Sequence, residues 1–139
     1  MRQAQHSLAI ETRGKGLYDV TDEVAQWVRE SGIRLGLVTV FITHTSASLL
    51  IQENADPEVL RDLERFFARL VPDGEPLFRH VEEGPDDMPA HVRAALTQTS
   101  IAIPVRDGKL AFGVWQGLYV YEHRNRPHQR KLVVHVVGE

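Results

Sequence analysis

Apolar residues recur along the chain with two periods, one typical of strands and one of helices. Leu35 to Thr43 is apolar and β-branched almost throughout, which predicts a buried central strand. Pro57 to Leu70 spaces its apolar residues three and four apart, which predicts an amphipathic helix that the pair Asp56-Pro57 begins. We expect this helix to bury its whole apolar stripe: Val59, Leu60, Leu63, Phe66, Phe67 and Leu70.

The remaining pattern predicts two shorter helices and several strands. Capping oxygens at residues 19–23 precede an apolar stripe that ends near Gly32, and Pro89 to Leu96 forms a short helix. A turn at residues 106–108 joins two strands. The expected strands cover residues 3–12, 47–52, 101–105, 109–114, 115–121 and 131–137. The sequence therefore predicts one α+β domain, residues 1–139, with a largely antiparallel sheet packed by a few helices.

Composition narrows the class of protein. The chain has seven histidines and no cysteine, so thiolate sites are excluded and a metal would be held by histidine nitrogen and carboxylate oxygen. The net charge of −3, with no basic block, argues against nucleic-acid binding. We see no signal-peptide core and no apolar run of transmembrane length, so we expect a cytoplasmic protein without a membrane partner.

Polar side chains gather in three segments at the ends of predicted elements. One segment reads FRHVEEGPDDMPAH and places His80 and His91 eleven positions apart. The carboxylates of Asp86 and Asp87 could bind a metal, orient the imidazoles, or cap the helix that Pro89 begins. Because the spacing matches no common zinc signature, a solvated acidic loop is the alternative interpretation.

A second segment follows the predicted central strand. It combines the imidazole of His44 with hydroxyls, among them Ser46 and Ser48, and with the carboxylates of Glu53 and Asp56. A serine nucleophile assisted by His44 is conceivable, but no GxSxG-like turn surrounds it, so a serine hydrolase is disfavoured. Backbone hydrogen bonding at a strand end is the simpler role for both serines.

The third segment, Gln116 to Arg124, alternates apolar with polar residues and ends on Glu122-His123-Arg124. Further arginines follow closely, and guanidinium groups bind phosphate or pyrophosphate bidentately, so this segment favours a small anion. An exposed basic turn is the alternative. Four histidines lie beside polar breaks at element ends, which favours one shared site for metal or acid–base chemistry. They are His44, His80, His91 and His123.

The motifs HTSASL, ENADP, H…EGPDDMPAH and WQGLYVYEHR resemble the YjbQ-like family, the secondary thiamine-phosphate synthase family, in order and over nearly the whole chain. The resemblance implies an α+β fold, a homotrimer, and a divalent metal, zinc foremost, on three or more of the four histidines. Cysteine commonly stands at Ala55 in the family and threonine at Val114, departures that argue against an essential thiol. The implied acidic and polar motif positions are Glu53, Asn54, Asp56, Asp86, Asp87, Gln116, Glu122 and Arg124.

The activity that the resemblance implies joins hydroxymethylpyrimidine pyrophosphate to thiazole phosphate, as a weak, secondary activity. Our leading hypothesis is a metal-dependent enzyme acting on a small phosphorylated or pyrophosphorylated compound, with thiamine-phosphate synthase-like transfer as the implied reaction. The catalytic residues would be Glu53, Asp86 and Arg124. The substrate-binding residues would be Ser46, Asn54, Asp56, Asp87, Gln116 and Glu122. The alternative is a non-catalytic trimeric protein that binds a metal or a small anion.

Overall fold

The structure, a computed structural model, describes residues 1–139 as three helices and eight strands. The helices are α1 (Thr21–Ser31), α2 (Pro57–Leu70) and α3 (Asp87–Leu96). The strands are β1 (Arg2–Thr12), β2 (Gly16–Asp19), β3 (Leu35–Ile42), β4 (Ala47–Glu53), β5 (Ser100–Arg106), β6 (Lys109–Leu110), β7 (Gln116–Glu122) and β8 (His128–Gly138). All strand pairs are antiparallel, in a five-stranded sheet β1-β8-β3-β5-β6 and a three-stranded sheet β2-β7-β4.

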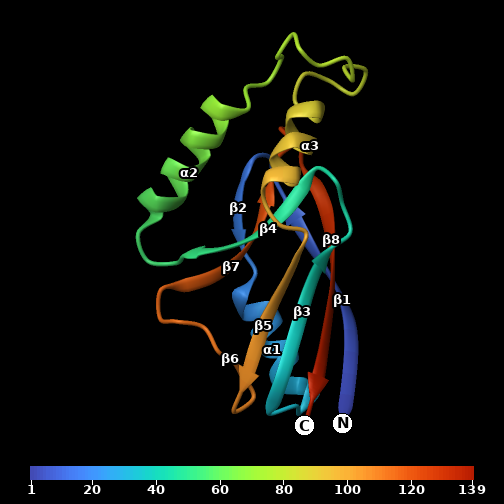
Figure 1. The fold of residues 1–139 in the computed structure, drawn as a ribbon, viewed down its shortest axis with the longest axis vertical. Helices are drawn as coiled ribbons and strands as arrows, with labels where there is room; N and C mark the ends of the chain where they lie inside the picture. Colours follow the sequence, from blue (N-terminus) through green and yellow to red (C-terminus); the bar gives the residue numbers. More distant parts are fainter.

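The long strands of the five-stranded sheet run side by side, while α2 stands out to one side of the molecule (Figure 1). Both termini lie at the same end (Figure 1), because β1 pairs with β8 along its whole length, from Arg2 opposite Gly138 to Thr12 opposite His128. No helix combines the length and the hydropathy that crossing a membrane requires.

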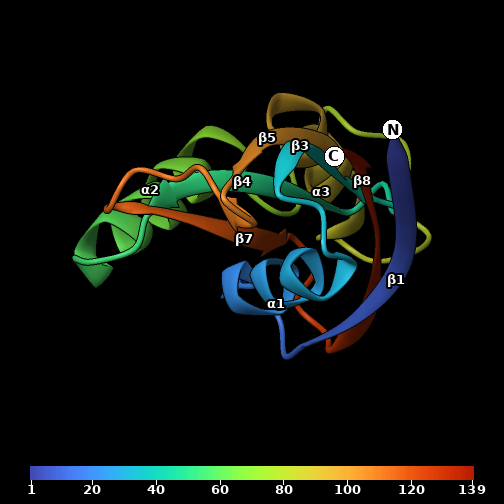
Figure 2. The same cartoon turned by 90° about the horizontal axis from the view of Figure 1, so that it is seen from below.

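The hydrophobic core lies between α1 and the two sheets. Val24 and Val28 of α1 are fully buried in it, and the helix ends at Gly32, whose φ of 75° suits a residue without a Cβ atom. Seen from below, α1 lies next to β7, and β1 curves past its other side (Figure 2). Alternate residues of the long strands complete the core: Val38, Val40, Ile42, Ile101, Ile103, Val105, Leu132, Val134 and Val136.

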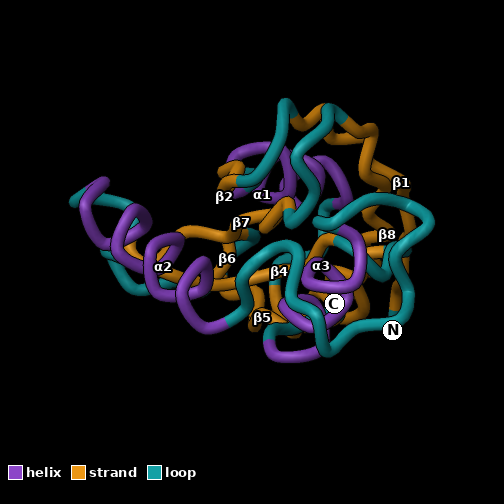
Figure 3. The backbone as a smooth tube through the Cα atoms, turned by 90° about the horizontal axis from the view of Figure 1, so that it is seen from above, coloured by secondary structure: helices purple, strands orange, loops and turns teal.

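Two short connections carry the chain between the sheets, and both lie at the same end of the molecule. Residues 43–46 lead from β3 to β4, and residues 123–127 lead from β7 to β8. They meet because Ala47, the first residue of β4, pairs with Glu122, the last residue of β7. α3 and the long loop before it lie over this end (Figure 3). The fold thereby gathers the three polar segments of the sequence.

The predicted α+β class and antiparallel pairing are confirmed, and α2 has the predicted bounds. Two predictions of burial were wrong. The central strand β3 is buried on one face only, and Leu35 on its other face is 67% exposed, because nothing in the chain covers that face. No residue of α2 is buried, and Phe66 and Leu70 are half exposed, because this helix extends beyond the sheets.

Three further predictions need correction. The strand expected at 109–114 stops at Leu110, because residues 113–116 form a turn in which the Gln116 side chain accepts a bond from the backbone N–H of Gly113. The strand β2 was not among the predicted strands. Residues 118–121 were expected to have one polar face, but all are buried, because β7 is covered on both faces: Leu118 and Val120 pack in the core, and Tyr121 packs against Phe67 of α2.

Candidate metal centre

One carboxylate gathers two imidazoles at the start of α3. Asp87 Oδ2 lies 2.7 Å from His80 Nε2 and 3.1 Å from His91 Nε2. Asp87 and His91 are four residues apart on α3 and therefore share one face of the helix, whereas His80 reaches in from the preceding loop. The three ligand atoms lie within 4.8 Å of one another. Two histidines and one aspartate form a donor set that suits a divalent metal.

The ring of His91 is fixed from its other side as well. Its Nδ1 lies 3.0 Å from the Thr45 carbonyl oxygen, which can only accept, so we assign the ring proton to Nδ1. In the neutral ring Nε2 then carries a lone pair that faces Asp87 Oδ2, a second acceptor. A proton or a metal cation placed between these two atoms would satisfy both of them. Metal-ligating histidines are typically oriented by such a bond from the far nitrogen to a backbone carbonyl.

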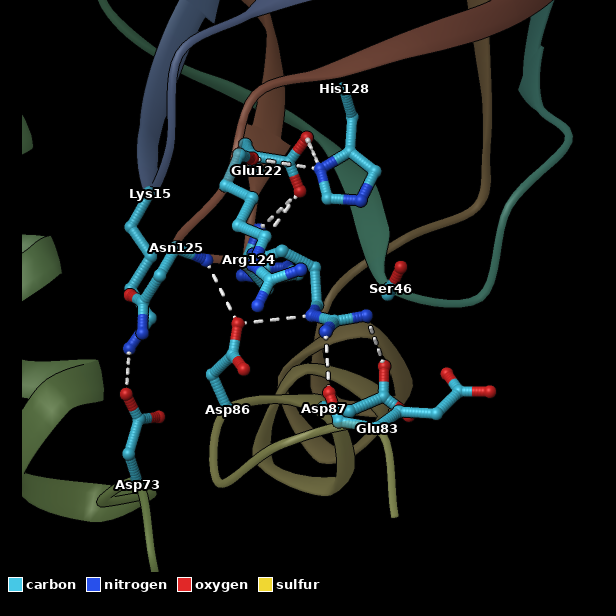
Figure 4. A network of polar contacts seen from close by, with 12 residues as sticks. Lys15, Ser46, Asp73, Glu83, Asp86, Asp87, Glu122, Arg124, Asn125 and His128 are labelled. Atoms are coloured by element: carbon cyan, nitrogen blue, oxygen red, sulfur yellow. Dashed lines mark hydrogen bonds and ion pairs between the residues drawn. The ribbon is translucent and has the colours of Figure 1, made fainter. Parts of the chain in front are cut away.

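Arg124 holds the other oxygen of Asp87, and Figure 4 shows its contacts with Asp86, Asp87 and Glu83. Its Nη1 donates to Asp87 Oδ1 at 2.7 Å, and its Nη2 donates to the Glu83 carbonyl oxygen at 2.9 Å. Burial raises the pKa of Asp87, but the hydrogen bond with His80 and the charge of Arg124 outweigh it, so the pKa lies below its usual value. The carboxylate that joins the two imidazoles is therefore an anion in a fixed orientation.

Asp86 lies beside this centre without reaching the imidazoles. Its Oδ2 accepts bonds from Arg124 Nε at 3.0 Å and from the Asn125 backbone N–H at 2.9 Å. Burial raises its pKa, but these two bonds more than compensate and lower it. Because the carboxylate is turned toward residues 124–125, it makes no cap bond to α3. Asp86 thus ties the start of α3 to the connection between β7 and β8.

A buried ion pair of Glu122 and Arg130 supports the same connection. Arg130 donates to Glu122 from Nε at 2.7 Å and from Nη2 at 2.5 Å, and Thr12 Oγ1 donates to Glu122 at 2.6 Å. Burial raises the pKa of Glu122, but these bonds outweigh it and the pKa is lowered. Arg130 Nη2 also donates to Ser46 Oγ at 3.0 Å. Glu122 and Ser46, predicted to bind substrate, are thus engaged with Arg130 inside the fold.

The four histidines predicted to share a site do not form one cluster within the chain. His44 accepts a bond from the Lys131 backbone N–H at Nε2, although its ring borders the same hollow as His91. His123 is fully buried, and its Nε2 lies 2.8 Å from Ser48 Oγ. Burial lowers the pKa of His123 to about 3, so its ring is neutral. Only His80 and His91 meet at Asp87.

The remaining predicted site residues lie at the far end of the β4–β7 ladder. Glu53 pairs with Gln116 there, whereas Ala47 pairs with Glu122 at the near end, six residues away. At the rise of an extended strand this separation is roughly 20 Å. The side chains of Asn54, Gln116 and Asp56 stabilise local structure. Asn54 donates to the carbonyl oxygens of Val114 and Gln116, and the Gln116 side chain accepts from the backbone N–H of Gly113. Asp56 caps α2 by accepting from the Glu58 backbone N–H.

Comparison with known proteins identifies the family to which the chain belongs. The family model described as UPF0047 protein YjbQ-like matches residues 6–139. The chain belongs to this YjbQ-like family. A UPF0047 protein of Synechocystis is 56% identical over 138 residues, which cover 99% of this chain and 94% of that protein. The YjbQ protein of Escherichia coli O157:H7 is 38% identical over 136 residues, which cover 97% and 98%.

Solved structures of YjbQ-like proteins share the fold. A protein of this family from Clostridium acetobutylicum has a TM-score of 0.84 at 34% identity, covering 96% of this chain and 99% of that one. A protein of unknown function from Sulfolobus solfataricus has a TM-score of 0.86 at 25% identity, covering 99% and 100%. Membership of the YjbQ-like family, which the motifs indicated, is thus confirmed, as is the α+β fold, whereas the thiamine-phosphate synthase activity stays a prediction.

Two residues of this YjbQ-like centre could not be predicted from the sequence. Thr45 positions His91 through its backbone carbonyl, and Asn125 positions Asp86 through its backbone N–H. Backbone atoms carry both contacts, so no pattern of side-chain types could have indicated them. Their neighbours His44 and Arg124 were the only signal that these connections mattered.

Proposed function

We propose that this YjbQ-like chain is a metal-dependent enzyme acting on a small phosphorylated or pyrophosphorylated compound, and that His80, Asp87 and His91 hold a divalent cation, zinc foremost. The observation that carries the proposal is the approach of two imidazole nitrogens to one carboxylate oxygen. Three protein ligands leave a fourth position open, as in catalytic zinc sites. A cation bound there would polarise a phosphoryl oxygen as a Lewis acid.

The surrounding residues would keep the ligands in place. Arg124 has its Nε and both terminal nitrogens engaged with Asp86, Asp87 and the Glu83 carbonyl, so its role is to orient Asp87. The Thr45 carbonyl oxygen does the same for His91. Outer contacts of this kind typically change metal affinity about 10–100-fold.

Two hollows flank the centre and give room for a small compound. One, of about 290 Å³, is bordered by His80 together with Phe78, Val81 and Met88. The other, of about 230 Å³, is bordered by His91 together with His44, Thr45 and Thr99. A substrate in the second hollow would meet the imidazole of His44. Thiamine-phosphate synthase-like transfer, which the resemblance implies, belongs to this proposal as a secondary activity of a cytoplasmic enzyme.

We propose further that the chain assembles as a homotrimer. The support is the uncovered face of the five-stranded sheet, where Leu37 lies opposite Pro104 and Phe41 is 46% exposed. Contiguous apolar surface of this kind marks an interaction site. The half-exposed apolar residues of α2 offer a second such surface. Glu53 lies at the far end of the β4–β7 ladder from the end beside the metal centre, so it could act as a base only at the centre of another copy.

Metal analysis followed by a screen of phosphorylated compounds tests the enzyme proposal. Protein purified without chelators should contain a stoichiometric divalent metal and should turn over a phosphorylated compound, and His91→Ala should lose both. The control His6→Ala removes an exposed histidine on β1 that stacks on Trp27 of α1, and it should keep both. Stoichiometric metal in His91→Ala would exclude the proposed ligand set.

The alternative function is a non-catalytic binding protein. It is favoured by one observation: Asp87 already contacts both imidazoles and Arg124, so its carboxylate has partners without a metal. A small anion would then be captured beside the two imidazoles. Thermal stabilisation by a phosphorylated compound, without turnover and without bound metal, would support this function, because a ligand of the folded state raises apparent stability.

A further inference from the structure

A second polar pocket lies on another flank of α3. We call it the Arg93 pocket; it has a volume of about 180 Å³ and is bordered by Lys15, Glu64, Phe67, Ala68, Arg93, Tyr121 and Glu122. Arg93 follows His91 by two residues, so the two side chains leave the helix about 200° apart. The Arg93 pocket is therefore separate from the metal centre, and its role does not depend on the proposed function.

Arg93 is a buried guanidinium with an unused donor. The residue is 4% exposed, and its Nη2 donates to the Val71 carbonyl oxygen at 2.6 Å and lies 3.6 Å from Asp73 Oδ1. Its Nε has no hydrogen-bond partner in the chain. An unsatisfied buried donor costs about 1–3 kcal/mol, and more when charged. Such a group is normally paired with a ligand or an ordered water.

A second unpaired atom lies close by. His123 Nδ1 is buried without a partner, while the Nε2 of the same ring contacts Ser48. The rings of His123 and Tyr121 are 4.4 Å apart, and Tyr121 borders the pocket. Burial and the nearby Glu64 raise the pKa of Tyr121 to about 12, so its hydroxyl keeps its proton. Tyr121 therefore offers its hydroxyl to the pocket, whereas the ring of His123 does not border it.

The charges around the pocket suit an anion. Lys15 Nζ pairs with Asp73 Oδ2 at 2.5 Å (Figure 4), and Asp73 is also the ion-pair partner of Arg93, so one carboxylate serves two cations. Two carboxylates also border the pocket: Glu122, whose charge Arg130 neutralises, and Glu64, which has no such cation in the pocket wall. Burial raises the pKa of its carboxyl, which makes it the acid in the pocket that most readily takes up a proton.

We propose that the Arg93 pocket binds a small oxyanion, the phosphate or carboxylate group of a small molecule, through Lys15 and the guanidinium of Arg93. Guanidinium and oxyanion form charge-assisted bonds that are roughly twice as strong as neutral ones. The rings of Phe67 and Tyr121, 5.8 Å apart and edge to face, form an apolar wall for the remainder of such a molecule. Neither the metal centre nor a metal ion takes part.

Titration of the full chain with inorganic phosphate and, separately, with acetate tests this site, with chloride at matched ionic strength as the reference. Calorimetry should show saturable binding of at least one of the two anions, and the preferred one identifies the ligand group. Lys15→Met should weaken this binding at least about tenfold, whereas Glu64→Gln removes a nearby negative charge and should tighten it at least about threefold. Lys109→Met removes a lysine from β6 and should change nothing.

His91→Ala, measured in parallel, should retain the binding, which separates this pocket from anion capture at the metal centre. The opposite effects expected of Lys15→Met and Glu64→Gln distinguish a ligand site from a general loss of stability, and neither variant alters Arg93. Absence of saturable binding for both anions would overturn the proposal and leave the unpaired Nε to ordered water. Equal affinity in Lys15→Met and the unaltered chain would overturn it as well.

Discussion

His91 lies one helical turn after Asp87, and its Nε2 is 3.1 Å from the same carboxylate oxygen that contacts His80. The other oxygen of Asp87 accepts a bond from Arg124 at 2.7 Å. One side chain thus connects α3, the loop before it and the connection between β7 and β8. The geometry of the candidate metal centre therefore depends more on Asp87 than on either histidine.

Replacement of Asp87 by asparagine should weaken divalent metal binding by more than about 100-fold. This is a larger loss than is usual for residues that only orient a metal ligand. The amide keeps the shape of the side chain but lacks the negative charge that faces both imidazoles. Calorimetric titration with zinc measures the affinity. Asp62→Asn, on the exposed face of α2, is the matched control and should bind as the unaltered chain does.

Replacement of Arg124 by lysine should reduce metal affinity about 10–100-fold, because lysine cannot reproduce the fork that holds Asp86 and Asp87 together. The positive charge is conserved, so a loss of metal affinity would report on the orientation of Asp87. Arg126→Lys, at an exposed position nearby, serves as the control. Unchanged affinity in Arg124→Lys would show that Asp87 keeps its position without the fork.

Replacement of Ser48 by alanine should lower the free energy of unfolding by about 1–3 kcal/mol, because the buried Nε2 of His123 loses its partner. Metal content and turnover should be unchanged, since the Ser48 hydroxyl contacts His123 and Thr97 and none of the proposed metal ligands. Urea denaturation gives the stability, with Ser7→Ala on exposed β1 as control. Abolished turnover in a folded, metal-loaded Ser48→Ala protein would instead revive a serine nucleophile.

Stability should fall as the pH drops below about 6.5, the ordinary pKa of histidine. The pKa of His123 is about 3 in the folded chain, so below pH 6.5 the unfolded chain binds a proton that the folded chain excludes. The stability that this neutral ring contributes is present above pH 6.5 and is lost at about 1.4 kcal/mol per pH unit as the pH falls toward 3.

Urea denaturation of His123→Gln between pH 7.5 and 5 isolates this effect, since the variant should lose that part of the slope while His135→Gln retains it. Equal slopes in both variants would contradict the buried neutral ring. Below pH 4.5 the lowered pKa of Glu122 should add a second loss of stability, because protonation then removes its pairing with Arg130.

Replacement of Leu37 by aspartate should shift the proposed trimer toward monomers, because it places a charge in the centre of the uncovered sheet face. Sedimentation velocity over a range of concentrations measures the change. Leu77→Asp introduces the same charge at a loop residue that is 78% exposed and should leave the assembly intact. A monomeric unaltered chain would end the trimer proposal.

Sequence patterns located most of the elements correctly where neighbouring residues decide the outcome. The bounds of α2 follow from Asp56, Pro57 and the apolar spacing after them, all local features. The burial of side chains was predicted less accurately from the sequence. The apolar stripe of α2 is amphipathic in sequence yet uncovered in the chain, because burial depends on what packs against a helix rather than on the helix itself.

By itself the sequence determined the fold class, the supply of histidine and carboxylate ligands without thiols, and the three polar segments, because these are properties of composition and local order. Tertiary structure alone decided which ligands meet. The pairing of Ala47 with Glu122 brings both sheet connections to one end, beside α3, and leaves Glu53 at the other. His123 contacts Ser48 in the interior, whereas His80 and His91 contact Asp87. Neither set of contacts could be predicted, because contacts between distant segments depend on strand register and packing.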